Sequence, residues 1–79
     1  MIKVYTTPDC MQCDQTKKFL DRNHVPYDAV DLTTNPDAMK LVQDMGYKSA
    51  PVVIVDGDDW SGFRFDKLKD VVAKHREKH

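Results

Sequence analysis

Alternating hydrophobic and polar positions in the first part of the chain predict a strand, a helix and a second strand. Residues 2–6 form a β-branched and aromatic run that the turn-forming pair Pro8-Asp9 closes, as expected of a strand. From residue 10 or 11 to about residue 23, apolar side chains recur every three or four positions, which is typical of a helix. After Pro26, residues 27–31 predict the second strand. The inner side of the helix is expected to consist of Cys13, Thr16, Phe19 and Leu20.

A second helix and a buried strand follow. Asn35-Pro36 supplies a helix N-cap with proline at the first helical position, and Gly46 is a suitable residue to end this helix. Residues 52–55 are apolar on both alternations, which predicts a central strand buried on both faces. The apolar face of the second helix is expected to consist of Met39, Leu41, Val42 and Met45.

A hairpin and a last helix complete the pattern. Asp56-Gly57 is a hairpin-type turn that leads into a short strand at residues 59–61, and a helix follows over about residues 66–75. The order β-α-β-α-β-β-α requires a parallel first pair of strands and an antiparallel pair at the hairpin. We therefore predict an α/β fold, a mixed four-stranded sheet with three helices on its faces. The inner side of the last helix is expected to consist of Leu68, Val71 and Val72.

The composition narrows the class of protein. A chain of 79 residues suits one domain, residues 1–79. Its 12 Lys and Arg against 13 Asp and Glu give a net charge of −1, which excludes a nucleic-acid binder that follows phosphates. No stretch approaches the roughly 20 apolar residues that span a bilayer. The N-terminus also lacks the apolar region of a signal peptide, so we expect a cytoplasmic protein.

The candidate chemistry is a Cys-x-x-Cys pair, Cys10 and Cys13, between the first strand and the first helix. A helix N-terminus favours a thiolate over a thiol through its dipole and its unpaired N–H groups. The spacing keeps the second sulfur close enough to bridge to the first. We assign Cys10 as the attacking thiolate and Cys13 as the resolving thiol that releases the mixed disulfide. Asp9, if close to Cys10, opposes this effect by raising its pKa.

Two other interpretations use the same cysteines. Metal-carrying domains of similar length typically contain a Met-x-Cys-x-x-Cys motif, but this chain has Pro8 at the position of that methionine. A closed zinc site needs four ligands, and only His24, His75 and His79 are available to add to the pair, none at finger spacing. We therefore expect no metal site and treat these histidines as surface residues. The second interpretation makes both cysteines incidental buried thiols.

Ala50-Pro51 stands immediately before the predicted central strand. Proline cannot donate to a sheet ladder, so its position there needs a structural or functional reason. A cis bond would turn the carbonyl and amide groups of Ala50 outward beside the cysteines, where a partner's backbone can pair with them. An ordinary trans proline at the start of a strand is the alternative, and the low frequency of cis X-Pro bonds favours it.

These motifs together resemble those of the glutaredoxin-like NrdH-redoxins, and the likeness covers nearly the whole chain. The resemblance implies a thioredoxin fold with a cis proline at Pro51. It also implies electron donation to class Ib ribonucleotide reductase and re-reduction by thioredoxin reductase with NADPH, with no bound cofactor besides the redox-active disulfide Cys10–Cys13. The segments that carry the resemblance are residues 5–13 (YTTPDCMQC), 49–53 (SAPVV) and 60–64 (WSGFR).

Departures from glutaredoxins concern glutathione. Glutaredoxins typically have the active-site motif Cys-Pro-Tyr-Cys, whereas here the two residues between the cysteines are Met11 and Gln12. Glutaredoxins also usually carry a lysine where this chain has Thr7, and that lysine helps to hold the glutathione carboxylate. Loss of one charged hydrogen bond is worth roughly 1.5–3 kcal/mol, or tenfold or more in affinity. Arg64 remains available to attract the tripeptide. Phe65 departs from NrdH-redoxins, which usually have proline there.

The remaining candidate residues are expected around the cysteines. Met11 offers partners an exposed, adaptable thioether, and Tyr5 is expected to pack against the cysteine loop. Trp60 has two interpretations, a core residue or a partly exposed docking aromatic beside Gly62. The residues expected to support the redox site or bind partners are Tyr5, Met11, Gln12, Ala50, Pro51, Trp60, Ser61, Gly62 and Phe63.

The predicted function is that of a dithiol electron carrier whose partners are thioredoxin reductase and ribonucleotide reductase. Three alternatives stay open: a glutathione-dependent glutaredoxin, a metal carrier that uses both sulfurs, and a non-catalytic interaction domain. A monomer is expected, because a small shuttle must present its thiols to two partners in turn.

Overall fold

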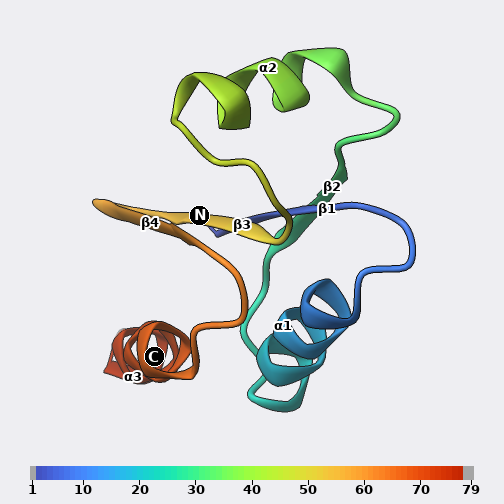
Figure 1. The fold of residues 1–79 in the computed structure, drawn as a ribbon. Helices are drawn as coiled ribbons and strands as arrows, with labels where there is room; N and C mark the ends of the chain where they lie inside the picture. Colours follow the sequence, from blue (N-terminus) through green and yellow to red (C-terminus); the bar gives the residue numbers. More distant parts are fainter. Residues whose placement is uncertain (1, 78–79) are drawn as a thin grey trace.

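The seven helices and strands follow the predicted order in the computed structural model, which describes residues 2–77 (Figure 1). The predicted boundaries agree with it to within two residues. In chain order, the elements are β1 (Lys3–Thr6), α1 (Met11–Arg22), β2 (Asp28–Asp31), α2 (Pro36–Asp44), β3 (Val52–Val55), β4 (Asp58–Ser61) and α3 (Phe65–Glu77).

The four strands form one mixed sheet in the order β2-β1-β3-β4. β1 and β2 run parallel, whereas β3 is antiparallel to both of its neighbours. Within this register, Tyr5 of β1 lies opposite Val52 of β3, and Val52 lies opposite Ser61 of β4. The predicted α/β fold with a mixed four-stranded sheet is therefore confirmed as a thioredoxin fold.

The helices cover both faces of the sheet, with α2 over one face and α1 and α3 over the other (Figure 1). This arrangement creates two apolar cores. The core beneath α1 and α3 is built from Val4, Leu20, Val25, Val53, Trp60, Leu68 and Val72. The core beneath α2 is built from Tyr5, Leu32, Ala38, Val42 and Val52.

α2 begins as the sequence predicts, but its apolar face is narrower. Asn35 is the N-cap, and its side-chain oxygen accepts a hydrogen bond from the Ala38 backbone N–H at 3.1 Å. Ala38 and Val42 face the sheet and are buried. The prediction that Leu41 and Met45 belong to this face is wrong, since they are 44% and 36% exposed. Leu41 is turned by about 100° from Val42 around the helix, which takes it off the inner side.

The structure also shows where the histidines lie, and whether any helix could cross a membrane. His24 is exposed and His75 is half-buried, whereas His79 lies outside the described residues. Within residues 2–77, no group of three or more His, Cys, Asp or Glu side chains is arranged to hold a metal ion. No helix in this part of the chain is long and apolar enough to cross a membrane.

Candidate redox site

The sheet register gathers three separate segments at one end of the molecule. The chain leaves β1 at Thr6 and enters α1 through a short loop that carries Cys10. Because β3 runs antiparallel to β1, Pro51 lies just before the start of β3 at this same end. β4 is antiparallel to β3, so Ser61 also arrives here, opposite Val52. The cysteines, the Ala50-Pro51 bond and the loop after β4 therefore meet around the first turn of α1.

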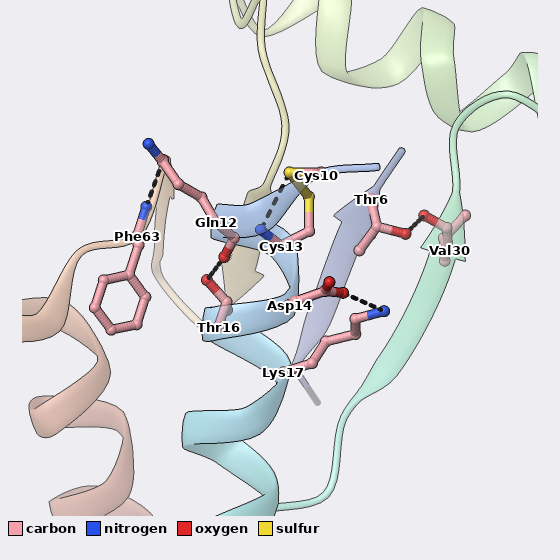
Figure 2. The surroundings of a disulfide bond; sticks show 9 residues. All are labelled: Thr6, Cys10, Gln12, Cys13, Asp14, Thr16, Lys17, Val30 and Phe63. Atoms are coloured by element: carbon pink, nitrogen blue, oxygen red, sulfur yellow. Dashed lines mark hydrogen bonds and ion pairs between the residues drawn. A yellow bond between two sulfur atoms is a disulfide. The ribbon is translucent and has the colours of Figure 1, made fainter. Parts of the chain in front are cut away.

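Cys10 and Cys13 are joined in a disulfide, with their Cα atoms 5.2 Å apart (Figure 2). Cys10 is the N-cap of α1 and has an extended backbone, whereas Cys13 lies inside the first turn. The Cys13 backbone N–H donates a hydrogen bond to the Cys10 Sγ at 3.1 Å. Cys13 is only 1% exposed, while Cys10 is half-buried.

This asymmetry gives the two sulfurs different capacities. Cys10 is the more accessible sulfur, and a backbone N–H that points at it stabilises negative charge there when the disulfide is reduced. Cys13 is shielded from solvent and partners, yet it remains within bonding distance of Cys10. A pair arranged in this way can carry out thiol–disulfide exchange, with one sulfur meeting the partner and the other closing the ring.

Met11 and Gln12 lie between the cysteines, and both are exposed. Met11, the first residue of α1, is 76% exposed. The Gln12 side chain extends in the other direction, towards the loop after β4. Its Oε1 accepts a hydrogen bond from the Phe63 backbone N–H at 3.2 Å (Figure 2).

One wall of the site is the 61–63 loop, which consists of Ser61, the last residue of β4, and of Gly62 and Phe63 after it, all half-buried. The Gly62 backbone N–H donates to the Pro51 carbonyl at 2.8 Å. Gly62 has a φ of +83°, a left-handed conformation that favours glycine. Of the predicted supporting residues, the structure thus brings Gln12, Pro51, Gly62 and Phe63 into one hydrogen-bonded arrangement.

The Ala50-Pro51 peptide bond is cis, as the family resemblance implies. Pro51 is fully buried and Ala50 is half-buried. A cavity of about 260 Å³ opens beside Ala50. Its lining includes Thr7 from the cysteine loop, Val42 from α2, and Lys48 from the segment before β3.

Two predicted supporting residues lie beneath the site rather than at its surface. Trp60 is 4% exposed and packs in the core between the sheet and α3, so the interpretation as a docking aromatic does not hold. Its Nε1 is buried and has no hydrogen-bond partner among the described residues. Tyr5 is also 4% exposed and belongs to the core beneath α2. Because successive residues of a strand face opposite sides, Tyr5 on β1 points to the side away from α1.

Two surface ion pairs lie at the two ends of the sheet, one of them near the site. Arg64, just before α3, donates two hydrogen bonds to the Asp66 carboxylate, at 3.2 and 3.0 Å. This pairing lowers the pKa of Asp66 and raises that of Arg64. At the other end of the sheet, Lys67 donates to Asp58 at 2.9 Å, and the bond lowers the pKa of Asp58.

Tyr47 is a residue that the sequence did not single out. Its hydroxyl donates a hydrogen bond to Oδ1 of Asp59 on β4, which ties the segment before Ala50-Pro51 to the sheet edge. The hydrogen bond, with smaller contributions from burial and nearby negative charge, raises the pKa of Tyr47 to about 12. No local sequence pattern links the two positions, since their contact depends on the pairing of β3 with β4.

A second cavity, about 360 Å³, lies away from the disulfide. It is lined at one edge by Ile2 before β1 and Asp28 at the start of β2, and at the other by Val55 at the end of β3 and Asp58 at the start of β4. All four positions belong to the end of the sheet opposite the cysteines. This cavity is therefore separate from the Cys10–Cys13 end, where the candidate chemistry lies.

The chain is similar to several known proteins over most of its length. Residues 2–60 match the sequence model of the glutaredoxin family. The chain is 35% identical over 68 residues to the glutaredoxin-like protein NrdH of Lactococcus lactis, covering 86% of this chain and 94% of the relative. It is 38% identical over 73 residues to the gene 56 protein of mycobacteriophage D29, covering 90% and 81%. The structure of NrdH-redoxin from Escherichia coli, a protein with a thioredoxin-like activity profile, superimposes with a TM-score of 0.86 at 31% identity, covering 89% and 92%.

Proposed function

The chain belongs to the glutaredoxin family, in its NrdH-redoxin branch, and is a thiol–disulfide oxidoreductase; from this premise we propose that it donates electrons to a class Ib ribonucleotide reductase and is re-reduced by thioredoxin reductase with NADPH. The observation that carries the proposal is the unequal cysteine pair, a half-buried Cys10 that accepts the Cys13 N–H and a Cys13 that is 1% exposed. Ribonucleotide reductase as the electron acceptor follows from the resemblance to NrdH-redoxins.

In the proposed cycle, the Cys10 thiolate attacks one sulfur of the partner's disulfide. A mixed disulfide forms between Cys10 and the partner, and the partner's other sulfur leaves as a thiolate that takes up a proton. Cys13 then loses its proton and attacks the Cys10 sulfur. The Cys10–Cys13 disulfide closes and the partner's second sulfur leaves as a thiolate that takes up the proton lost by Cys13. Two electrons have then passed to the partner, and its two new thiols carry one proton from solvent and one from Cys13. Thioredoxin reductase reverses these steps on the carrier.

The choice of reductant rests on the residues around the pair. Thr7 offers no positive charge where glutaredoxins usually hold the glutathione carboxylate with a lysine. Arg64, a cation that could attract an anionic tripeptide, already donates two hydrogen bonds to Asp66. A ligand carboxylate must therefore compete with Asp66 for the guanidinium. The thioredoxin-like activity profile of the E. coli relative supports the same choice.

The remaining assignments complete the proposal. We assign partner contact to Met11, whose side chain is 76% exposed beside Cys10, and to the backbone at Ala50, Pro51 and the 61–63 loop. Tyr5 and Trp60 support the site from the two cores. We further propose that residues 1–79 act as one domain, in the cytoplasm and as a monomer, with no bound cofactor.

A reduction assay in two arms tests the reductant. The oxidised protein is mixed with NADPH and thioredoxin reductase in one arm, and with NADPH, glutathione and glutathione reductase in the other. We expect rapid NADPH consumption only in the first arm. Consumption only in the second identifies a glutathione-dependent glutaredoxin. No consumption in either arm, together with stoichiometric binding of copper(I), identifies a metal carrier.

A trapping experiment tests the roles of the cysteines. Cys13→Ser should accumulate a mixed disulfide through Cys10 with the partner enzyme, detectable on a non-reducing gel, because the resolving sulfur is missing. Cys10→Ser should form none and should not turn over. A Cys13→Ser variant that cycles normally with a protein disulfide would refute the proposed sequence of steps.

A further inference from the structure

The loop of residues 61–63 is held from two sides by successive backbone N–H groups. The Gly62 N–H donates to the carbonyl of Pro51, immediately before β3, at 2.8 Å. The next N–H, that of Phe63, donates to the side-chain oxygen of Gln12 at 3.2 Å. Gln12 lies between the two cysteines, 51 positions away in the sequence. These two bonds connect the three segments that surround the disulfide.

Gln12 is itself fixed at its backbone. Its carbonyl oxygen accepts a hydrogen bond from the Thr16 hydroxyl at 2.9 Å, one turn further along α1 (Figure 2). Thr16 is fully buried, so this contact holds the first turn of the helix against the core. The Gln12 side chain therefore extends to Phe63 from an anchored base.

Gly62 fits closely against the Gln12 side chain. A Cβ atom at position 62 would lie 3.3 Å from the Gln12 Oε1, tighter than an ordinary contact. The φ of +83° already disfavours other residues at this position. The absence of a side chain at Gly62 thus leaves space for the Gln12 amide to reach the Phe63 N–H.

We propose that Gln12 is a positioning residue for thiol–disulfide exchange. Its amide oxygen holds the Phe63 backbone, and with it the 61–63 loop, at a fixed place beside the disulfide. A protein partner then docks against a preformed wall and does not have to order the loop as it binds. Cys10 and Cys13 carry the chemistry, and Gln12 acts through Phe63. That the wall receives a protein partner rests on the proposed function, whereas the holding of Phe63 does not.

The test compares Gln12→Met with Gln15→Met. Methionine keeps the length of glutamine but has no comparable acceptor for the Phe63 N–H. Gln15 is the matched control, an exposed glutamine one turn along the same helix whose side chain makes no hydrogen bond within residues 2–77. Gln12→Glu is the rescue variant, because its carboxylate oxygen can accept the same bond.

Two readouts are measured. Hydrogen exchange of the Phe63 amide in the oxidised protein reports on the loop without any partner. Reduction of insulin disulfides, with dithiothreitol as the electron source, gives kcat and KM without depending on thioredoxin reductase. We expect Gln12→Met to speed exchange at Phe63 and to raise KM by roughly two- to tenfold, the value of one net hydrogen bond, with little change in kcat. Gln15→Met should change neither, and Gln12→Glu should restore slow exchange.

Three results would overturn the inference. These are unchanged Phe63 exchange in Gln12→Met, equal effects of Gln12→Met and Gln15→Met, and a fall in kcat at constant KM. The two proposals can fail separately. If thioredoxin reductase does not reduce the protein, but Phe63 exchange is slow and depends on Gln12, the proposed electron source is refuted and the positioning role of Gln12 is retained.

Discussion

Phe65 offers a direct test of how this chain adapts where it departs from related NrdH-redoxins, which usually have proline at that position. It is the first residue of α3, and its ring packs edge-on against Phe19 of α1, with centroids 5.4 Å apart at an interplanar angle of 83°. The Lys69 ammonium lies 5.5 Å from the Phe65 centroid. Phe65 therefore joins the two helices on this face of the sheet.

The free energy that Phe65 contributes to folding can be worked out from its exposed fraction, which is 53%. Full burial of a phenylalanine side chain contributes about 1.5–3 kcal/mol, so burial of roughly half of it contributes about 1 kcal/mol. An edge-to-face pair adds about 0.5–1.5 kcal/mol. We expect Phe65→Ala to lower the free energy of unfolding by about 1.5–2.5 kcal/mol, and the melting temperature by roughly 4–8 °C for each kcal/mol. Phe65→Pro should cost less, because proline suits the first helical position.

The assay is a double-mutant cycle with Phe19→Ala, Phe65→Ala and the double variant. Urea unfolding of the oxidised proteins, followed by circular dichroism, gives each free energy of unfolding. We expect a coupling energy of about 0.5–1.5 kcal/mol between the two rings. A coupling below about 0.3 kcal/mol, the error of additivity, would refute the claim that the rings stabilise each other.

Two further predictions concern the cores and the surface around the site. The Asp59 hydrogen bond raises the pKa of Tyr47 from 10.0 to about 12, so its stabilising effect is complete below pH 10 and is lost as the pH rises towards 12. Urea midpoints from pH 9 to 12 should therefore fall further in the wild type than in Tyr47→Phe, and equal declines would contradict the bond. Trp60→Phe removes a buried N–H that has no partner within residues 2–77, so we expect a loss of unfolding free energy of no more than about 1.5 kcal/mol in the same assay. A loss above about 3 kcal/mol, the range of a large core truncation, would contradict this prediction.

Local signals in the sequence were sufficient for most of the fold. Periodicity located α1 and α3, and the Asn35-Pro36 pair marked the start of α2, because these signals act within a few residues. The apolar run of residues 52–55 correctly indicated a central strand, with Val52 and Val53 both 1% exposed. The Cys-x-x-Cys pair was placed at the right helix end for the same reason.

Features that depend on tertiary packing were not predictable. Leu41 and Trp60 are both apolar, yet Leu41 is 44% exposed and Trp60 only 4%, because the packing of α2 and β4 decides which side chains are covered. The Gln12–Phe63 bond joins positions 51 apart, so no local pattern contains it. The effect of Phe65 was open for the same reason, since its value depends on where Phe19 lies.

The central claim is that the N-terminus of α1 makes Cys10 the reactive sulfur, while the buried Cys13 is the resolving sulfur. Brief alkylation of the fully reduced protein with limiting iodoacetamide at pH 6, followed by peptide mass spectrometry, tests this claim most directly. The account predicts label on Cys10 alone, at a rate several times that of free cysteine, because the Cys13 N–H that donates to the Cys10 sulfur favours its thiolate form. Equal labelling of the two cysteines, or a Cys10 rate no faster than free cysteine, would contradict it.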